Sequence, residues 1–128
     1  MKKLFLRSLY LIPYTLCLLL LSCHKEGPGG KAAIQGLVKH HSQLIPGAVV
    51  YIKYGVKESP GSNVTYYDAN VTADANAHYT FPDLKYGDYY LFGVGFDSVI
   101  VQAVNGGVPV EIKTKTETVE MDVPVTEP

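Results

Sequence analysis

The sequence predicts an all-β protein, an antiparallel Greek-key β-sandwich of about seven strands preceded by a signal peptide. Beyond residue 23 of the 128, no apolar residues recur at the i, i+3, i+4 spacing of an amphipathic helix. Short apolar or alternating runs occur instead, and turn-forming residues separate them every ~8–12 positions. About 100 residues then remain for the domain, which is enough to bury one hydrophobic core.

The first 22 residues are predicted to be a lipoprotein signal peptide. A basic start is followed by a mostly apolar segment, residues 9–21, which is shorter than the about 20 residues that span a bilayer as a helix. The segment ends Leu20-Leu21-Ser22-Cys23, which is similar to the bacterial lipobox. The resemblance implies acylation of Cys23 and anchoring in a membrane. A plain signal peptide without lipid is the alternative.

The charge that remains after residue 22 is negative. Lys2, Lys3 and Arg7 leave with the signal peptide, so 8 lysines face 12 acidic side chains, a net charge of −4. No arginine and no basic cluster remain in the sequence, which argues against nucleic acid as a partner. Of the two cysteines, Cys17 lies in the apolar segment and Cys23 is at the predicted acylation site. The folded part is therefore expected to have neither a disulfide nor a thiol nucleophile.

Residues 23–31 are expected to be a flexible tether, because His24–Gly30 holds three glycines and one proline. The β-sandwich domain is expected over residues 32–128. In its first strand Ile34, Gly36 and Val38 share one face.

The following strands are predicted from their patterns and from the turns between them. A polar connection, His40-His41-Ser42-Gln43, precedes a central strand over 48–54. The stretch 55–63 is expected to be a loop and 64–71 an edge strand. Two further strands begin at Tyr79 and Tyr89, the second reaching residue 96.

The last part of the chain contains a predicted hairpin and a final strand. The runs 99–104 and 108–112 flank Asn105-Gly106-Gly107, which is a typical hairpin turn sequence. The final strand, 116–125, alternates most clearly and is expected to bury one face only. The residues of the buried face are Val119, Met121, Val123 and Val125.

The stretch Thr72–Leu91 carries a family resemblance. Its pattern T-x-D-x-N-x-x-Y-x-F-x-x-L-x-x-G-x-Y-x-L resembles the central segment of carboxypeptidase regulatory-like domains, which are transthyretin-like (prealbumin-like) β-sandwiches common in envelope proteins of Bacteroidetes. The segments Ile34–Val38 and Ile45–Ile52 resemble the first two strands of that family. Taken together with the lipobox-like sequence at Cys23, the resemblance implies a lipoprotein of the outer membrane, on its periplasmic face or at the cell surface, with another envelope protein as partner.

The sequence departs from this family at Ala77, where the family usually has glycine. A tight turn needs positive φ at Asn76 and at the next residue, and alanine in that conformation costs on the order of 1 kcal/mol. Either the turn is longer than two residues or the strain is tolerated.

No catalytic, metal or cofactor site is predicted. His40 and His41 are expected in an exposed loop, and adjacent residues on a strand point to opposite faces, which makes them a poor chelate. No G-x-S-x-G motif surrounds any serine. The sequence therefore predicts a non-catalytic protein without cofactor.

Tyrosine is the unusual feature, with eight after Cys23. In the pairs Tyr66-Tyr67 and Tyr89-Tyr90 the partners face opposite sides of a strand, so one ring of each pair lies outside the core. Tyr66, Tyr67 and Tyr90 are the candidate contacts to a ligand or partner, although tyrosine also simply covers outer sheet faces. Two functions stay open: a structural or protein-interaction module, and a lipoprotein that binds a small ligand or carbohydrate through these tyrosines.

Overall fold

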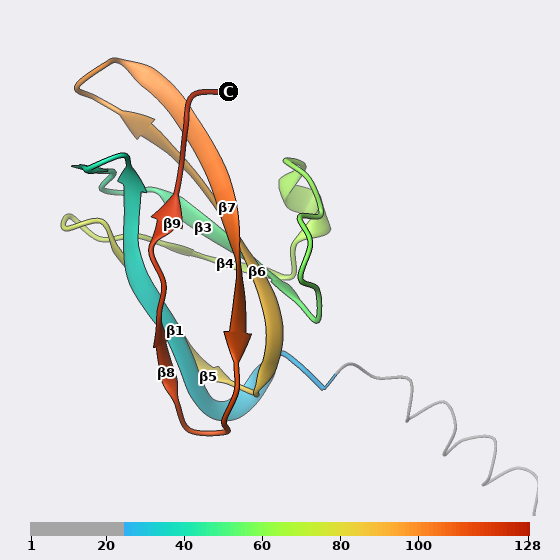
Figure 1. The fold of residues 1–128 in the computed structure, drawn as a ribbon. Helices are drawn as coiled ribbons and strands as arrows, with labels where there is room; N and C mark the ends of the chain where they lie inside the picture. Colours follow the sequence, from blue (N-terminus) through green and yellow to red (C-terminus); the bar gives the residue numbers. More distant parts are fainter. Residues whose placement is uncertain (1–24) are drawn as a thin grey trace, which may run out of the picture.

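The computed structural model describes residues 25–128, and these residues form an all-β protein, as the sequence predicts. Within this range the chain contains nine strands, rather than about seven, and one 3-10 turn, η1 (Val64–Tyr66) (Figure 1). The strands are β1 (Pro28–His40), β2 (Gln43–Leu44), β3 (Val49–Tyr54), β4 (Ala69–Thr72), β5 (His78–Leu84), β6 (Gly87–Asp97), β7 (Gln102–Ile112), β8 (Thr118–Glu120) and β9 (Val123–Pro124).

The strands form two sheets. One is wholly antiparallel, in the order β4-β3-β6-β7. The other is built around β1, which pairs antiparallel with β2 and β5 and parallel with β8 and β9. The expected purely antiparallel pairing is therefore wrong for the last two strands, because the chain leaves β7, turns, and returns beside β1 in the same direction as β1 (Figure 1).

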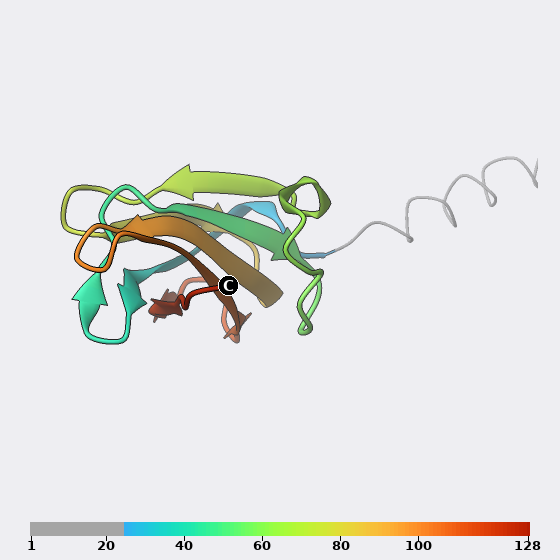
Figure 2. The ribbon, with the colours of Figure 1, turned by 90° about the horizontal axis from the view of Figure 1, so that it is seen from above.

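One hydrophobic core joins the two sheets. Ile34 and Val38 from β1 are fully buried, as are Ile52 from β3 and Leu91 from β6. The predicted alternation of β1 is confirmed, because the even-numbered residues from Ala32 onward are buried and the residues between them are less so. Two sheets around a shared core are consistent with a β-sandwich (Figure 2).

The chain is fixed to the body of the protein earlier than expected. The amide of Gly27 donates to the Tyr89 hydroxyl at 2.9 Å, and its carbonyl accepts from the amide of Lys85 at 2.9 Å. Glu26 accepts from the amide of Asp88 at 3.1 Å. The structure therefore differs from the predicted flexible tether over residues 27–31, because Gly27 is hydrogen-bonded to Lys85 and Tyr89 and because β1, which begins at Pro28, pairs with β5; residues 23 and 24 lie outside the described residues.

The predicted hairpin turn at Asn105-Gly106-Gly107 is wrong. These residues lie inside β7, paired with Phe92, Gly93 and Val94 of β6, and the turn is Ser98–Val101. Gly106 and Gly107 instead allow neighbouring backbone to pack closely against β7. A Cβ on Gly106 would lie 2.3 Å from the carbonyl oxygen of Pro124, and one on Gly107 would lie 2.6 Å from that of Leu91.

The turn before β5 is tight and strained at one residue. Ala77 has φ 63°, and its amide donates to the carbonyl of Asp74 at 3.0 Å. The Asp74 carboxylate accepts from the amides of Asn76 and His78, and these bonds lower the pKa of Asp74. Only the second of the two expected positive φ angles occurs, which matches a type I turn followed by one left-handed residue.

The final strand alternates as predicted but is divided into β8 and β9. Val123 and Val125 are buried, and Val119 and Met121 pack against the core. Between the two short strands the carbonyl of Met121 accepts a hydrogen bond from the hydroxyl of Tyr79. Gly36 makes this approach possible, since a Cβ there would lie 2.1 Å from that carbonyl oxygen.

Candidate functional site

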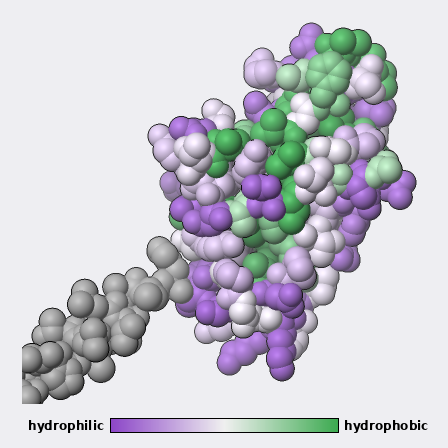
Figure 3. Space-filling view, turned by 180° about the vertical axis from the view of Figure 1, so that it is seen from behind, coloured by the Kyte–Doolittle hydropathy of each residue, from purple (hydrophilic) through white to green (hydrophobic). Residues whose placement is uncertain are grey.

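The end of β6 and the turn between β6 and β7 expose an apolar surface, which we call the hairpin tip: Phe96, Val99, Ile100 and Val101. Their exposed fractions are 53%, 68%, 43% and 72%. No charged residue occurs between Asp97 and Glu111, and Asp97 itself is buried. Hydrophobic residues gather at the upper end of the molecule in Figure 3, the end that carries this turn in Figure 1. A set of adjacent exposed apolar side chains is typical of an interaction surface.

The backbone of the hairpin tip is strained. Val101 has φ 56°, a left-handed conformation that is an outlier for a β-branched residue. The strain persists because the rest of the turn is fixed: the Asp97 carboxylate accepts from the amide of Val99 at 2.9 Å, and β6 and β7 are paired up to Asp97 and Gln102. Residues held in such conformations concentrate at functional sites.

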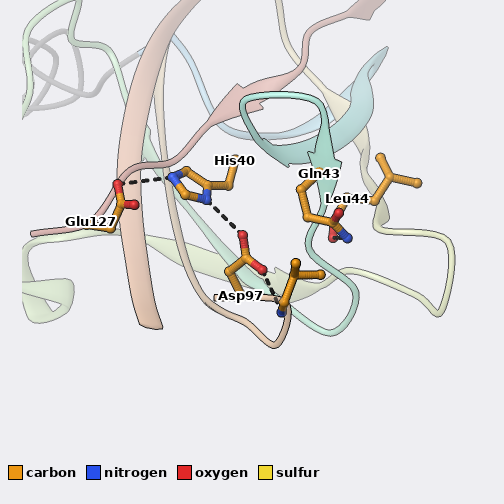
Figure 4. Close-up of polar contacts among 6 residues, drawn as sticks. His40, Gln43, Leu44, Asp97 and Glu127 are labelled. Carbon is orange, nitrogen blue, oxygen red and sulfur yellow. Dashed lines mark hydrogen bonds and ion pairs between the residues drawn. The ribbon is translucent and has the colours of Figure 1, made fainter. Parts of the chain in front are cut away.

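A buried histidine holds this turn to the rest of the domain. His40, the last residue of β1, is 5% exposed and lies between two carboxylates (Figure 4). Its Nδ1 is 2.8 Å from Oδ2 of Asp97, and its Nε2 is 3.0 Å from Oε2 of Glu127. The cluster thus joins β1, the end of β6 and the C-terminal segment. His41 lies beside it, with ring centroids 4.7 Å apart.

The charges in this cluster stabilise each other. The hydrogen bond to Asp97 is the main reason that the pKa of His40 is raised above 6.5; burial opposes the shift, and Glu127 supports it. The hydrogen bond from His40 lowers the pKa of Asp97. A backbone hydrogen bond and then His40 lower the pKa of Glu127. These shifts favour an imidazolium that donates from both nitrogens.

Both ring nitrogens of His40 are occupied by hydrogen bonds within the protein. Both ring nitrogens face carboxylates, so neither is directed at a hydroxyl or thiol from which it could take a proton. Over residues 25–128, no group of three or more His, Cys, Asp or Glu side chains is placed to hold a metal ion. The cluster positions the hairpin tip.

The three tyrosines predicted as contacts lie in different surroundings. The ring of Tyr67 stacks on Phe92, with centroids 5.6 Å apart and planes at 19°, and its hydroxyl donates to the carbonyl of Gly61 at 2.8 Å. Tyr66 is 57% exposed on η1, and Tyr90 is half-buried in β6. The predicted strand over 64–71 begins only at Ala69, so Tyr66 and Tyr67 do not alternate as strand neighbours.

The remaining predicted site residue is Cys23. It lies outside the described residues, so its predicted acylation stays a prediction.

The expectation that His40 lies in an exposed loop is wrong, since His40 is buried at the end of β1, and the sequence analysis identified neither the histidine cluster nor the hairpin tip. Continuing the alternation of Ile34 and Val38 by one more step places His40 on the buried face, which is the signal that identifies it. No local pattern pairs His40 with Asp97, 57 residues away, or with Glu127, 87 residues away. No local signal marks the hairpin tip, because Asn105-Gly106 has the composition of a hairpin turn and the run 99–104 has that of a strand.

Comparison with known proteins identifies no family. No family model matches the chain, and no curated protein is significantly similar to it. Between residues 25 and 128 there is no helix of the length and apolarity needed to cross a membrane.

Proposed function

We propose that this protein is a non-catalytic, lipid-anchored β-sandwich module of the cell envelope that docks onto a partner protein through its hairpin tip. The carboxypeptidase regulatory-like pattern of Thr72–Leu91 and the two-sheet fold support the transthyretin-like, Greek-key assignment. The lipobox-like sequence that ends at Cys23 supports the anchor. The exposed apolar turn supports the interaction role.

The hairpin tip is the observation that carries this proposal. Its apolar side chains are exposed, the one charged residue among them in sequence, Asp97, is buried, and the turn keeps a strained valine. Contiguous exposed apolar side chains are typical of interaction sites, and strained backbone conformations cluster at functional sites. The buried His40 cluster adds rigidity beneath the turn, and rigidity lowers the entropy lost on binding.

The position of the tip favours a protein over the anchoring membrane as its occupant. The described chain begins at Lys25, and this start and the hairpin tip lie at opposite ends of the molecule in both ribbon views (Figures 1 and 2). Lys25 is two residues beyond Cys23, a reach of about 7 Å in extended chain. A lipid on Cys23 therefore leaves the tip directed away from the bilayer, toward an envelope protein with an apolar groove.

The test compares the full chain with a double tip variant, Val99→Ser with Ile100→Ser, after chemical cross-linking in cells. Tyr66→Ser is the matched control, since Tyr66 lies on another surface and its exposed fraction falls between those of Val99 and Ile100. Each variant is first shown by its melting curve to be folded. We expect a discrete cross-linked complex with the unmodified chain and with Tyr66→Ser, and its loss with the tip variant.

Retention of the complex in the tip variant would contradict the docking proposal. Loss of the complex with Tyr66→Ser, and not with the tip variant, would favour the tyrosine surface instead. That alternative is weaker because Tyr67 stacks on Phe92 and is not free to receive a ligand on that face.

A further inference from the structure

The fold gathers four lysines around one pocket at the end opposite the hairpin tip. The pocket has a volume of about 460 Å³ and is lined by Lys25, Gly29, Gly30, Lys31, Lys85, Tyr86, Lys115 and Thr116. The lining comes from the start of β1, the β5–β6 turn and the β7–β8 turn, which meet at the lower end of Figure 1. The basic cluster that the linear sequence lacks is thus assembled by the fold.

The charge of this pocket stands out against the rest of the chain. Half of the 8 lysines that follow residue 22 line it, although 12 acidic side chains give this part a negative charge overall. No acidic residue belongs to the lining. In the described part of the chain the lysine salt bridges are Lys39–Asp122 and Lys53–Asp68, so none of the pocket lysines is paired within 4 Å of a carboxylate.

A cation–π contact and two glycines shape the walls of the pocket. Lys25 lies over the ring of Tyr86, 5.2 Å from its centroid, an arrangement that fixes an ammonium group by cation–π attraction. Gly29 has φ 100° and Gly30 has no room for a side chain, since a Cβ would lie 2.1 Å from the carbonyl oxygen of Leu84. The glycines leave the backbone of β1 bare along one wall.

We propose that this lysine pocket binds a phosphate group, and that its source is the headgroup of an anionic lipid. Unpaired lysines bind phosphate as point charges, and each basic residue near an anionic membrane surface adds attraction. The choice of a lipid rests on the proposed anchor, because acylation of Cys23 places the pocket, which begins at Lys25, at the depth of the headgroups. The pocket would then orient the domain, with the hairpin tip directed outward.

The experiment measures the reactivity of individual lysines toward an amine-modifying reagent by mass spectrometry, with the full chain purified from cells. One arm adds inorganic phosphate to the protein in detergent. The other compares nanodiscs of phosphatidylglycerol with nanodiscs of phosphatidylcholine. Lys57 and Lys113, which lie outside the lining, are the internal controls. We expect phosphate to protect Lys31, Lys85 and Lys115, and phosphatidylglycerol to protect them without added phosphate.

A variant makes the assignment quantitative. Lys85→Gln is expected to raise the phosphate concentration that half-protects Lys31 by about fivefold, the effect of one lysine at a charged surface. Lys113→Gln, two residues from Lys115 but outside the lining, should leave it unchanged.

Two results would overturn the inference. Equal reactivity of pocket and control lysines in every condition would exclude an anion site. Protection by free phosphate without any difference between the two bilayers would exclude the lipid as its source. Failure of the anchor itself is detected separately, because a chain without acyl groups does not enter the nanodiscs and still reports on phosphate.

Discussion

Replacing Val101 by asparagine should stabilise the protein and weaken docking at the same time. Val101 has φ 56°, a conformation that costs a valine about 1–2 kcal/mol and that asparagine adopts more readily. The residue is 72% exposed, so the substitution removes only about a quarter of the about 1.5–3 kcal/mol that a fully buried valine contributes. The net gain in the free energy of unfolding is then about 0.5–1 kcal/mol.

Urea denaturation of the two proteins measures this difference, and thermal melting should show an increase in Tm of about 2–8 °C for a domain of this size. Ala77→Gly is the matched comparison, since Ala77 has a similar φ of 63° but is fully buried. Relief of about 1–2 kcal/mol of strain is there offset by the loss of a buried methyl, about 0.8 kcal/mol, and by the flexibility of glycine, about 0.5–1 kcal/mol. The stability of Ala77→Gly should therefore stay close to that of the unmodified protein.

A decrease in stability by Val101→Asn would refute the strained turn, and with it the structural reason to regard the hairpin tip as functional. An increase in stability combined with undiminished formation of the cross-linked complex would show that Val101 is strained for some purpose other than docking.

Three further predictions concern the cluster, the core and the anchor. Folding raises the pKa of His40 above 6.5, so the stabilisation that His40 contributes is complete below pH 6.5 and is lost as the pH rises through the pKa of the folded protein. Urea denaturation at a series of pH values from below to above 6.5 should show this decline in the free energy of unfolding, and His40→Gln should make the pH dependence flatter. Tyr79→Phe leaves the carbonyl of Met121 without its donor and should lower the free energy of unfolding by about 1–2 kcal/mol, whereas an unchanged value would mean that water replaces the hydroxyl. Cys23→Ser should abolish incorporation of labelled palmitate in cells, and persistent labelling would place the acyl groups elsewhere.

The alternation of apolar and polar residues along the chain was sufficient to predict the all-β class and most of the hydrophobic core. Ile34 and Val38 in β1, and Val123 and Val125 in the last segment, are buried as their spacing predicts. Such patterns are local and depend only on which side of a strand each residue faces. Parallel pairing of β8 and β9 with β1 is not local, and no short motif distinguishes it from the antiparallel pairing that was expected.

The turn between β6 and β7 shows where local signals compete. Asn105-Gly106 has the composition of a hairpin turn, yet the glycines are required for close contact with Pro124 and Leu91. The observed turn, Ser98–Val101, is apolar and is stabilised by the Asp97 carboxylate, which His40 holds from another strand. Tertiary contacts therefore decide the position of the turn. The hairpin tip and the lysine pocket both depend on residues that come together only when the sheets assemble.

A photo-crosslinking amino acid placed at Ile100 in living cells gives the decisive measurement for the docking proposal, with the same probe at Tyr66 as reference. Irradiation should produce one discrete adduct of higher mass from the probe at Ile100 and none from the probe at Tyr66. An adduct from Tyr66 alone, or none from Ile100 while the protein is folded and present at normal level, would show that the hairpin tip does not contact a partner.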